Sequence, residues 1–203
     1  MYARCLRWEF GEVIARADAA PWPELPALAL CENVTGAPPR QVTTVRIGWT
    51  PDEWRVLFHC ADTNAWATLR ERGAPLYEEE VVEIFLDPVG DLASYFEIEV
   101  NPLNAVLELV LRRNRSGYRK DFGWRCEGLR TAVNCTGTDW TAELAIPFRS
   151  LVADAPQPGS RWRANFLRID RPAGTPRELS AWSPTRLGTF HVPQRFGVIE
   201  FAE

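Results

Sequence analysis

Two neighbouring runs set the architecture of this 203-residue chain: Leu76-Tyr77-Glu78-Glu79-Glu80-Val81-Val82-Glu83-Ile84-Phe85-Leu86-Asp87-Pro88 and Tyr95-Phe96-Glu97-Ile98-Glu99-Val100-Asn101-Pro102. In the second run apolar residues alternate with Glu97 and Glu99, whereas in the first an apolar stretch rich in β-branched and aromatic residues surrounds the single carboxylate of Glu83, and a proline ends each run. A two-residue period is typical of a half-buried strand, and proline ends a strand because it lacks the backbone donor. We therefore expect two strands here, separated by a turn at Asp87-Pro88.

Similar alternation recurs along the chain and predicts nine strands in all, at residues 42–49, 54–60, 81–86, 95–100, 105–111, 129–135, 140–146, 162–169 and 196–201. Turn sequences rich in Pro, Gly, Asn and Asp separate them. Helical turns are expected only at residues 147–152 and 62–72. Nine short strands with so little helix predict an all-β fold, a single antiparallel β-sandwich of two packed sheets, immunoglobulin-like or jelly-roll-like.

Proline is concentrated in residues 20–39, which therefore cannot form a central strand. We expect one domain over residues 1–203, with residues 1–41 as an N-terminal segment that wraps its outside. Five cysteines without a C-x-x-C pair argue against a disulfide framework or a zinc site. Free thiols are expected, and a single bridge between Cys126 and Cys135 on adjacent strands is the alternative.

The composition describes a globular chain, with 46% hydrophobic residues, 25% charged residues and a net charge of -4. This charge gives no general attraction to nucleic acid or anionic membranes. Charges or prolines interrupt every apolar run, so neither a membrane span nor a secretory signal is predicted. The chain by itself therefore indicates a cytoplasmic protein, and the oligomeric state stays open.

Several phrases taken together resemble the carbohydrate-binding family 9-like domains, a group of DOMON-like β-sandwiches. They are the two runs above and residues 140–148, 159–170, 181–184 and 196–197, in the family's order and spacing. The resemblance implies a non-catalytic sandwich that binds mono- or oligosaccharides or polysaccharide ends between two tryptophans. It also implies calcium, and an extracellular module beside the catalytic domain of a glycoside hydrolase system.

Nine tryptophans are candidates for stacking on the C–H faces of a sugar ring. Trp49, Trp54, Trp140 and Trp162 lie within alternating strands and are expected in the core. Trp66 and Trp182 lie in loop-like segments at the positions where the family presents its aromatics. We expect these two to hold the ring.

Sugar hydroxyls need planar polar partners near those tryptophans. Strand parity and loop position select six candidates: Glu83, Glu99, Asn101, Arg168, Asp170 and His191. A structural ion pair between Arg168 and a carboxylate is the alternative for that residue. Calcium would find hard oxygen ligands near loops at Asp62, Glu78, Glu79, Glu80, Asp87 and Asp91, although no calcium-loop motif is present and the metal ligands stay unknown.

Other functions have weaker support in the sequence. No catalytic motif is present, and no pair of carboxylates can be nominated as acid and base by spacing alone. Haem held by Met and His is excluded because Met1 is the only methionine. A protein-interaction module remains an alternative, with the basic residues 112–120 as its contact surface.

Overall fold

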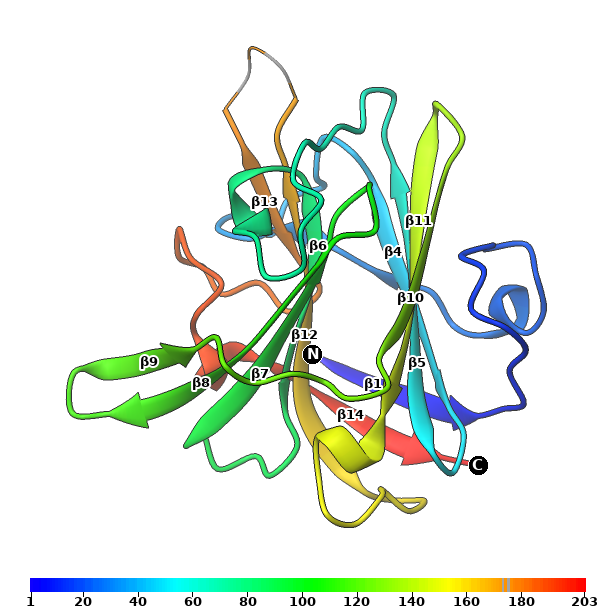
Figure 1. The fold of residues 1–203 in the computed structure, drawn as a ribbon, viewed down its shortest axis with the longest axis vertical. Helices are drawn as coiled ribbons and strands as arrows, with labels where there is room; N and C mark the ends of the chain where they lie inside the picture. The colour runs from blue at the N-terminus through cyan, green and yellow to red at the C-terminus, as the bar shows by residue number, and fades with distance from the viewer. Residues whose placement is uncertain (173, 175) are drawn as a thin grey trace.

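The computed structural model describes residues 1–172, 174 and 176–203, which form β-strands and short 3-10 turns (Figure 1). The strands are β1 (Tyr2–Arg7), β2 (Leu28–Ala29), β3 (Cys31–Glu32), β4 (Thr43–Trp49), β5 (Glu53–Ala61), β6 (Val81–Asp87), β7 (Ser94–Val100), β8 (Val106–Asn114), β9 (Gly117–Asp121), β10 (Arg130–Cys135), β11 (Asp139–Pro147), β12 (Arg161–Asp170), β13 (Glu178–Ala181) and β14 (Gly197–Ala202). The 3-10 turns are η1 (Trp22–Glu24), η2 (Leu76–Glu78), η3 (Phe148–Ser150) and η4 (Pro193–Arg195). The all-β prediction is confirmed.

The strands form one continuous sheet in the order β10-β11-β5-β4-β1-β14-β12-β6-β7-β8-β9. Strand β1 runs parallel to both of its neighbours, β14 and β4, whereas the other strand pairs of this sheet are antiparallel. The expected pair of separate antiparallel sheets is therefore wrong, because β1 and β14 carry the hydrogen bonding from one half into the other. The result is a mixed sheet that curls on itself.

The two halves of the curled sheet face each other across one apolar core (Figure 1). We call β4, β5, β10 and β11 the first arm, and β12, β6, β7, β8 and β9 the second. Phe166 of β12 contacts two rings of β5, with centroids 5.8 Å from Trp54 and 6.1 Å from Phe58. Trp54 and Trp140 have no exposed surface, and Trp49 and Trp162 are also buried, as predicted. Replacing such a tryptophan by alanine costs about 3–5 kcal/mol.

A second apolar cluster covers the opposite, outer face of the second arm. Strand parity sends Val82, Ile84 and Leu86 into the core and turns Phe85 outward. Phe85 packs there against Tyr95 of β7 and Phe196 beside η4. This outer cluster carries the pocket described below.

Residues 1–41 do not all wrap the outside, since β1 is a central strand of the sheet. Wrapping begins beyond it, where Trp22 and Leu25 pack on Leu57 of β5. The expected helical turn at residues 147–152 is present as η3, whereas the one expected at residues 62–72 is absent, because that described segment is irregular. All five cysteines lie in the described part of the chain and are free, so the bridge between Cys126 and Cys135 does not form.

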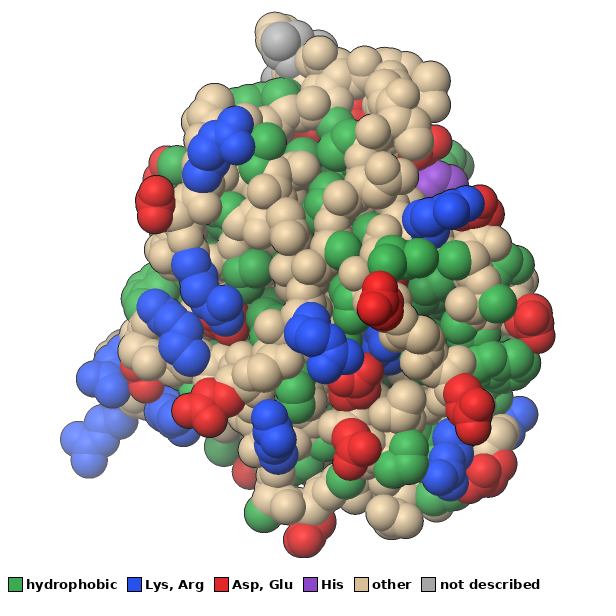
Figure 2. Space-filling view, turned by 45° about the vertical axis from the view of Figure 1, so that its right-hand side comes forward, with side chains coloured by type: hydrophobic (Ala, Val, Ile, Leu, Met, Phe, Trp, Pro, Cys, Tyr) green, Lys and Arg blue, Asp and Glu red, His purple; other side chains and the backbone are tan. Residues whose placement is uncertain are grey.

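The surface carries acidic and basic side chains interspersed on the face shown in Figure 2. Such mixing agrees with the small net charge of the chain. Among the described residues, no helix has the length and hydropathy required to cross a membrane.

Candidate functional site

A pocket with a volume of about 170 Å³ lies on the outer face of the second arm. Its walls come from η2, from β6, β7, β9, β12 and β13, and from the loop that precedes η4. The lining residues are Tyr77, Glu83, Glu97, Lys120, Ile169, Arg177, Leu179, Gly188, Thr189, Phe190 and His191. The pairing of β6 to β9 brings these distant segments together.

Three glutamates, which we call the pocket glutamates, cluster at the floor of this pocket: Glu83 and Glu97 line it, and Glu99 lies directly beside them. Glu83 of β6 lies opposite Glu99 of β7 in the ladder, and Glu97 shares their face two residues earlier. One carboxylate oxygen from each lies within 4.8 Å of the others. Each side chain is at most 2% exposed. Three acidic groups are therefore held together away from bulk water.

The pocket glutamates lack partners for most of their charge. No described residue donates a hydrogen bond to Oε2 of Glu97 or to either oxygen of Glu99. The Lys120 ammonium stands 4.0 Å from Glu97 Oε1, beyond hydrogen-bond distance. Burial, together with the charge of neighbouring glutamates, raises the pKa of Glu83 and Glu99 well above the ordinary value, and burial raises the pKa of Glu97. The floor therefore favours the uptake of positive charge.

His191 stands beside this floor as a neutral group. Its ring stacks on Phe85, with centroids 5.1 Å apart, and its Nδ1 lies 2.8 Å from the Tyr95 hydroxyl. Burial, assisted by the charge of Lys120, lowers the pKa of His191 to about 4. Where Tyr95 donates to Nδ1, the proton of the imidazole resides on Nε2, which can then donate to a ligand.

The remaining walls combine apolar surface with two cations. Tyr77 and Phe190 supply aromatic surface, and Ile169 and Leu179 supply aliphatic surface. Lys120 lies 5.2 Å from the centroid of the Tyr77 ring. Arg177 is exposed at the pocket. The pocket thus presents apolar faces, carboxylate acceptors and cationic donors around one small space.

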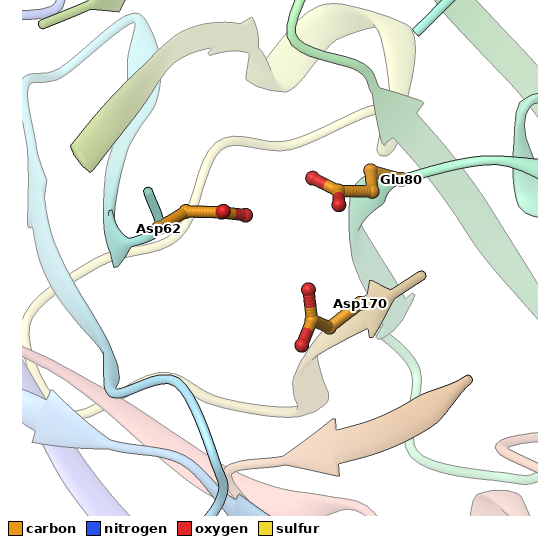
Figure 3. Close-up of side chains that lie close together, drawn as sticks. All are labelled: Asp62, Glu80 and Asp170. Carbon is orange, nitrogen blue, oxygen red and sulfur yellow. The ribbon is translucent and has the colours of Figure 1, made fainter. Parts of the chain in front are cut away.

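A second acidic cluster, which we call the inner cluster, lies on the core side of the sheet. Asp62, Glu80 and Asp170 point toward one another in Figure 3, from the ends of β5, β6 and β12. The Arg168 guanidinium lies 2.5 Å from Asp62 Oδ2 and 3.3 Å from Asp170 Oδ1. It also donates to the Thr43 hydroxyl and to the Ala61 carbonyl, each at 3.1 Å. Arg168 of the second arm is thereby bonded to β4 and β5 of the first.

Glu80 is the member of the inner cluster that Arg168 does not hold. It is fully buried, and no described residue donates a hydrogen bond to its carboxylate. Burial and the charge of Asp62 raise the pKa of Glu80 to about 8. Near neutral pH Glu80 is therefore mainly protonated, which lowers the net charge of the inner cluster.

The structure divides the predicted polar residues into separate places. Glu83 and His191 line the pocket, and Glu99 lies next to Glu83 behind the lining. Arg168 and Asp170 belong to the inner cluster, where Arg168 forms ion pairs with Asp62 and Asp170. Asn101 shapes a turn, because its Oδ1 accepts from the backbone of Leu103 and Ala105. A ligand in the pocket therefore faces only part of the predicted set.

The two tryptophans expected to hold a sugar ring do not line this pocket. Trp66 is half-buried, and its Nε1 donates to the Arg171 carbonyl at 2.6 Å. Trp182 is 2% exposed and packs on Phe166 with ring centroids 5.6 Å apart. A Cβ at Gly197 would overlap the Trp182 ring, so this close approach requires the glycine. The expectation that Trp182 offers a free face is therefore wrong.

Several residues that line the pocket are not predicted as site residues from the sequence. Tyr77 opens the quoted run 76–88, but nothing local distinguishes it from a core aromatic. Lys120 ends the basic stretch 112–120, and only the pairing of β8 with β9 directs it toward Glu97. Arg177 and Phe190 lie in loops whose position depends on the tertiary fold.

The carboxylates proposed as calcium ligands are already engaged in several cases. Glu79 accepts from the backbone of Thr68 and Leu69, and Asp87 accepts from the backbone of Gly90 and Leu92. Asp62 is bound by Arg168. These three residues do not fit the role of free calcium ligands. Calcium stays a prediction, which elemental analysis of the purified protein would check.

Comparison with known proteins relates this geometry to a family. No curated protein matches the chain. A module of carbohydrate-binding family 9 from Caldicellulosiruptor kristjanssonii, solved with cellotriose, is similar over 100% of this chain and 94% of that chain, at 16% identity and a TM-score of 0.76. A structure of a family 9 module from the same organism with glucose is similar over 98% of this chain and 95% of that chain, at 16% identity and a TM-score of 0.71.

A putative carbohydrate-binding protein from Bacteroides uniformis is similar over 99% of this chain and 98% of that chain, at 18% identity and a TM-score of 0.79. At such low identities these likenesses show a shared fold. The family model named Carbohydrate-binding family 9 matches residues 32–201, which is most of the chain. This chain belongs to carbohydrate-binding family 9.

Proposed function

We propose that the protein binds carbohydrate without catalysis and holds one sugar ring in the pocket on the outer face of the second arm. The observation that carries this proposal is the combination found there: the Tyr77 ring, the carboxylates of Glu83 and Glu97, and the cationic Lys120 surround one space. A pyranose has apolar C–H faces and a rim of hydroxyls. Aromatic surface suits the faces, and charged acceptors and donors suit the rim.

The size of the pocket favours a single ring. About 170 Å³ is well below the 300–1,000 Å³ that is usual for drug-sized ligands. A monosaccharide, or the end of a longer chain, is the ligand class that fits. Family neighbours solved with glucose and with cellotriose support this class.

The arrangement of the pocket glutamates supports binding rather than hydrolysis. Canonical glycosidases place two carboxyl groups on either side of the scissile bond. Glu83, Glu97 and Glu99 instead project from adjacent strands on the same sheet face. A ring in the pocket meets Glu83 and Glu97 from one side, where they act as hydrogen-bond acceptors.

Titration calorimetry with glucose, cellobiose, cellotriose and xylobiose tests the proposal. We expect binding of at least one of these sugars by the wild type, and a loss of tenfold or more, about 1.4 kcal/mol, in Tyr77→Ala. Tyr2→Ala is the matched control, because Tyr2 is 54% exposed and does not line the pocket. Absence of binding to every sugar, or equal affinity for Tyr77→Ala and wild type, would contradict the proposal.

A further inference from the structure

The fold compensates the pocket glutamates only in part, through Lys120 at 4.0 Å from Glu97 Oε1 and through a proton that Glu99 shares with Glu97. Both oxygens of Glu99 and Oε2 of Glu97 are buried, and no described residue donates to them. A neutral sugar offers hydroxyl donors to such oxygens, but it brings no positive charge. Burying carboxylates without a counter-charge is costly, so a cationic ligand group gains more here than a hydroxyl does.

The three carboxylates lie close enough together for one primary ammonium to interact with all of them. An ammonium has three N–H donors in a tetrahedral arrangement, and hydrogen bonds of about 2.8 Å place the accepting oxygens about 4.6 Å apart. The three oxygens lie within 4.8 Å of one another. Glu83 and Glu97 line the pocket, and the fully buried Glu99 lies next to them behind the lining. One ammonium in the pocket can thus contact Glu83 and Glu97 and attract the adjacent Glu99.

The pocket glutamates favour the uptake of a single positive charge. Burial raises the pKa of each of them, so the cluster retains a proton more readily than an exposed carboxylate does when no ligand is bound. An ammonium ligand can replace that proton and supply the same single positive charge. Lys120 and Arg177 line the same pocket, so a divalent metal ion would meet repulsion from two cationic side chains.

We propose that the pocket selects amino sugars with a free ammonium over the corresponding neutral sugars, the ammonium being bound by Glu83, Glu97 and Glu99. This inference rests on the proposed function and specifies its substrate class. The inner cluster offers no equivalent site, because the Arg168 guanidinium already bonds to Asp62 and Asp170.

Calorimetry at about pH 6, where the amine is protonated, with D-glucosamine, D-glucose and N-acetyl-D-glucosamine tests the inference. We expect glucosamine to bind at least tenfold more tightly than glucose, and N-acetylglucosamine to lose this advantage because its nitrogen is an uncharged amide. Glu97→Gln should bring the affinities for glucosamine and glucose within about threefold. Glu80→Gln, which neutralises a buried carboxylate of the inner cluster, should keep the wild-type preference.

The outcomes separate this inference from the proposed function. Equal affinity of the wild type for glucosamine and glucose would overturn the amino-sugar preference and leave carbohydrate binding intact. Binding of none of these sugars, nor of the neutral oligosaccharides above, would overturn both. A titration with calcium chloride adds a third arm. If calcium raises the Tm of the wild type but not of Glu97→Gln, and also displaces glucosamine, the cluster is a metal site and the ammonium assignment fails.

Discussion

The inner cluster and the pocket glutamates have the same number of carboxylates but different surroundings. In the inner cluster, Arg168 bonds to Asp62 and Asp170, and burial keeps Glu80 mainly protonated. In the pocket, no described residue donates to Glu99, and Lys120 stays 4.0 Å from Glu97. In the inner cluster, the charge of the carboxylates is balanced by Arg168, which also joins the two arms of the fold. In the pocket, the charge of the carboxylates is balanced only by an added proton or a bound ligand.

The largest expected effect is the loss of stability when Arg168, the cation of the inner cluster, is replaced. Arg168→Met leaves the charges of Asp62 and Asp170 buried without a partner and removes the bonds to Thr43 and Ala61. We expect a loss of about 3–5 kcal/mol in the free energy of unfolding, measured by urea denaturation. Arg161→Gln, which breaks the exposed pair with Glu200, should leave the free energy of unfolding close to that of the wild type, because solvent screens the pair. Equal losses in the two variants would show that Arg168 does not join the arms.

A smaller effect is expected from pH through Glu80. Its pKa of about 8 in the folded state exceeds the ordinary value of about 4.3 for an unfolded chain, so the folded state binds the extra proton between these values. The contribution of Glu80 to stability is therefore complete below about pH 4.3 and is lost as pH rises toward about 8. Asp62, Asp170, Arg168 and Cys60 are the ionisable groups around it.

The measurement is the unfolding free energy of wild type and Glu80→Gln between about pH 5 and pH 9. The wild type should lose about 1–3 kcal/mol more than the variant over this range, because glutamine does not titrate. Parallel curves for the two proteins would mean that Glu80 does not hold the proton.

Replacing a pocket glutamate should make the fold more stable and sugar binding weaker. Glu99→Gln removes one of three adjacent buried carboxylates, and so should raise the unfolding free energy at about pH 8 by about 1–2 kcal/mol. The same variant should bind sugar at least tenfold more weakly in calorimetry. Unchanged sugar affinity together with a higher free energy of unfolding would show that Glu99 destabilises the fold and has no part in binding.

The smallest effect is expected at Trp66, which tests the stacking role that the sequence suggested. Trp66→Phe removes the hydrogen bond to the Arg171 carbonyl and should cost about 1 kcal/mol of stability. Since Trp66 does not line the pocket, the sugar affinity of the Trp66→Phe variant should stay within about twofold of wild type. A larger loss of affinity in Trp66→Phe or Trp66→Ala would place sugar at Trp66 instead.

Local periodicity predicted most of the strands and part of the site. The alternation in residues 81–86 and 95–100 became β6 and β7, and strand parity placed Glu97 and Glu99 on one face. Only the pairing of β6 with β7 put Glu83 opposite Glu99. Strand β1 was missed because its central position depends on parallel pairing with β14, which is distant in sequence. Trp182 was misplaced because the space that accepts its ring exists only where Gly197 lies against it.

The sequence by itself determined most of the strands, the four core tryptophans that lie within them and the face of its own strand on which a carboxylate lies, because these follow from a two-residue period and local turn chemistry. The tertiary structure decided which carboxylates meet a cation. Arg168 reaches Asp62 only because the two arms face each other, and Tyr77, Lys120 and His191 surround the pocket glutamates only through long-range packing. Charge compensation depends on distance in space, and separation along the chain does not give that distance.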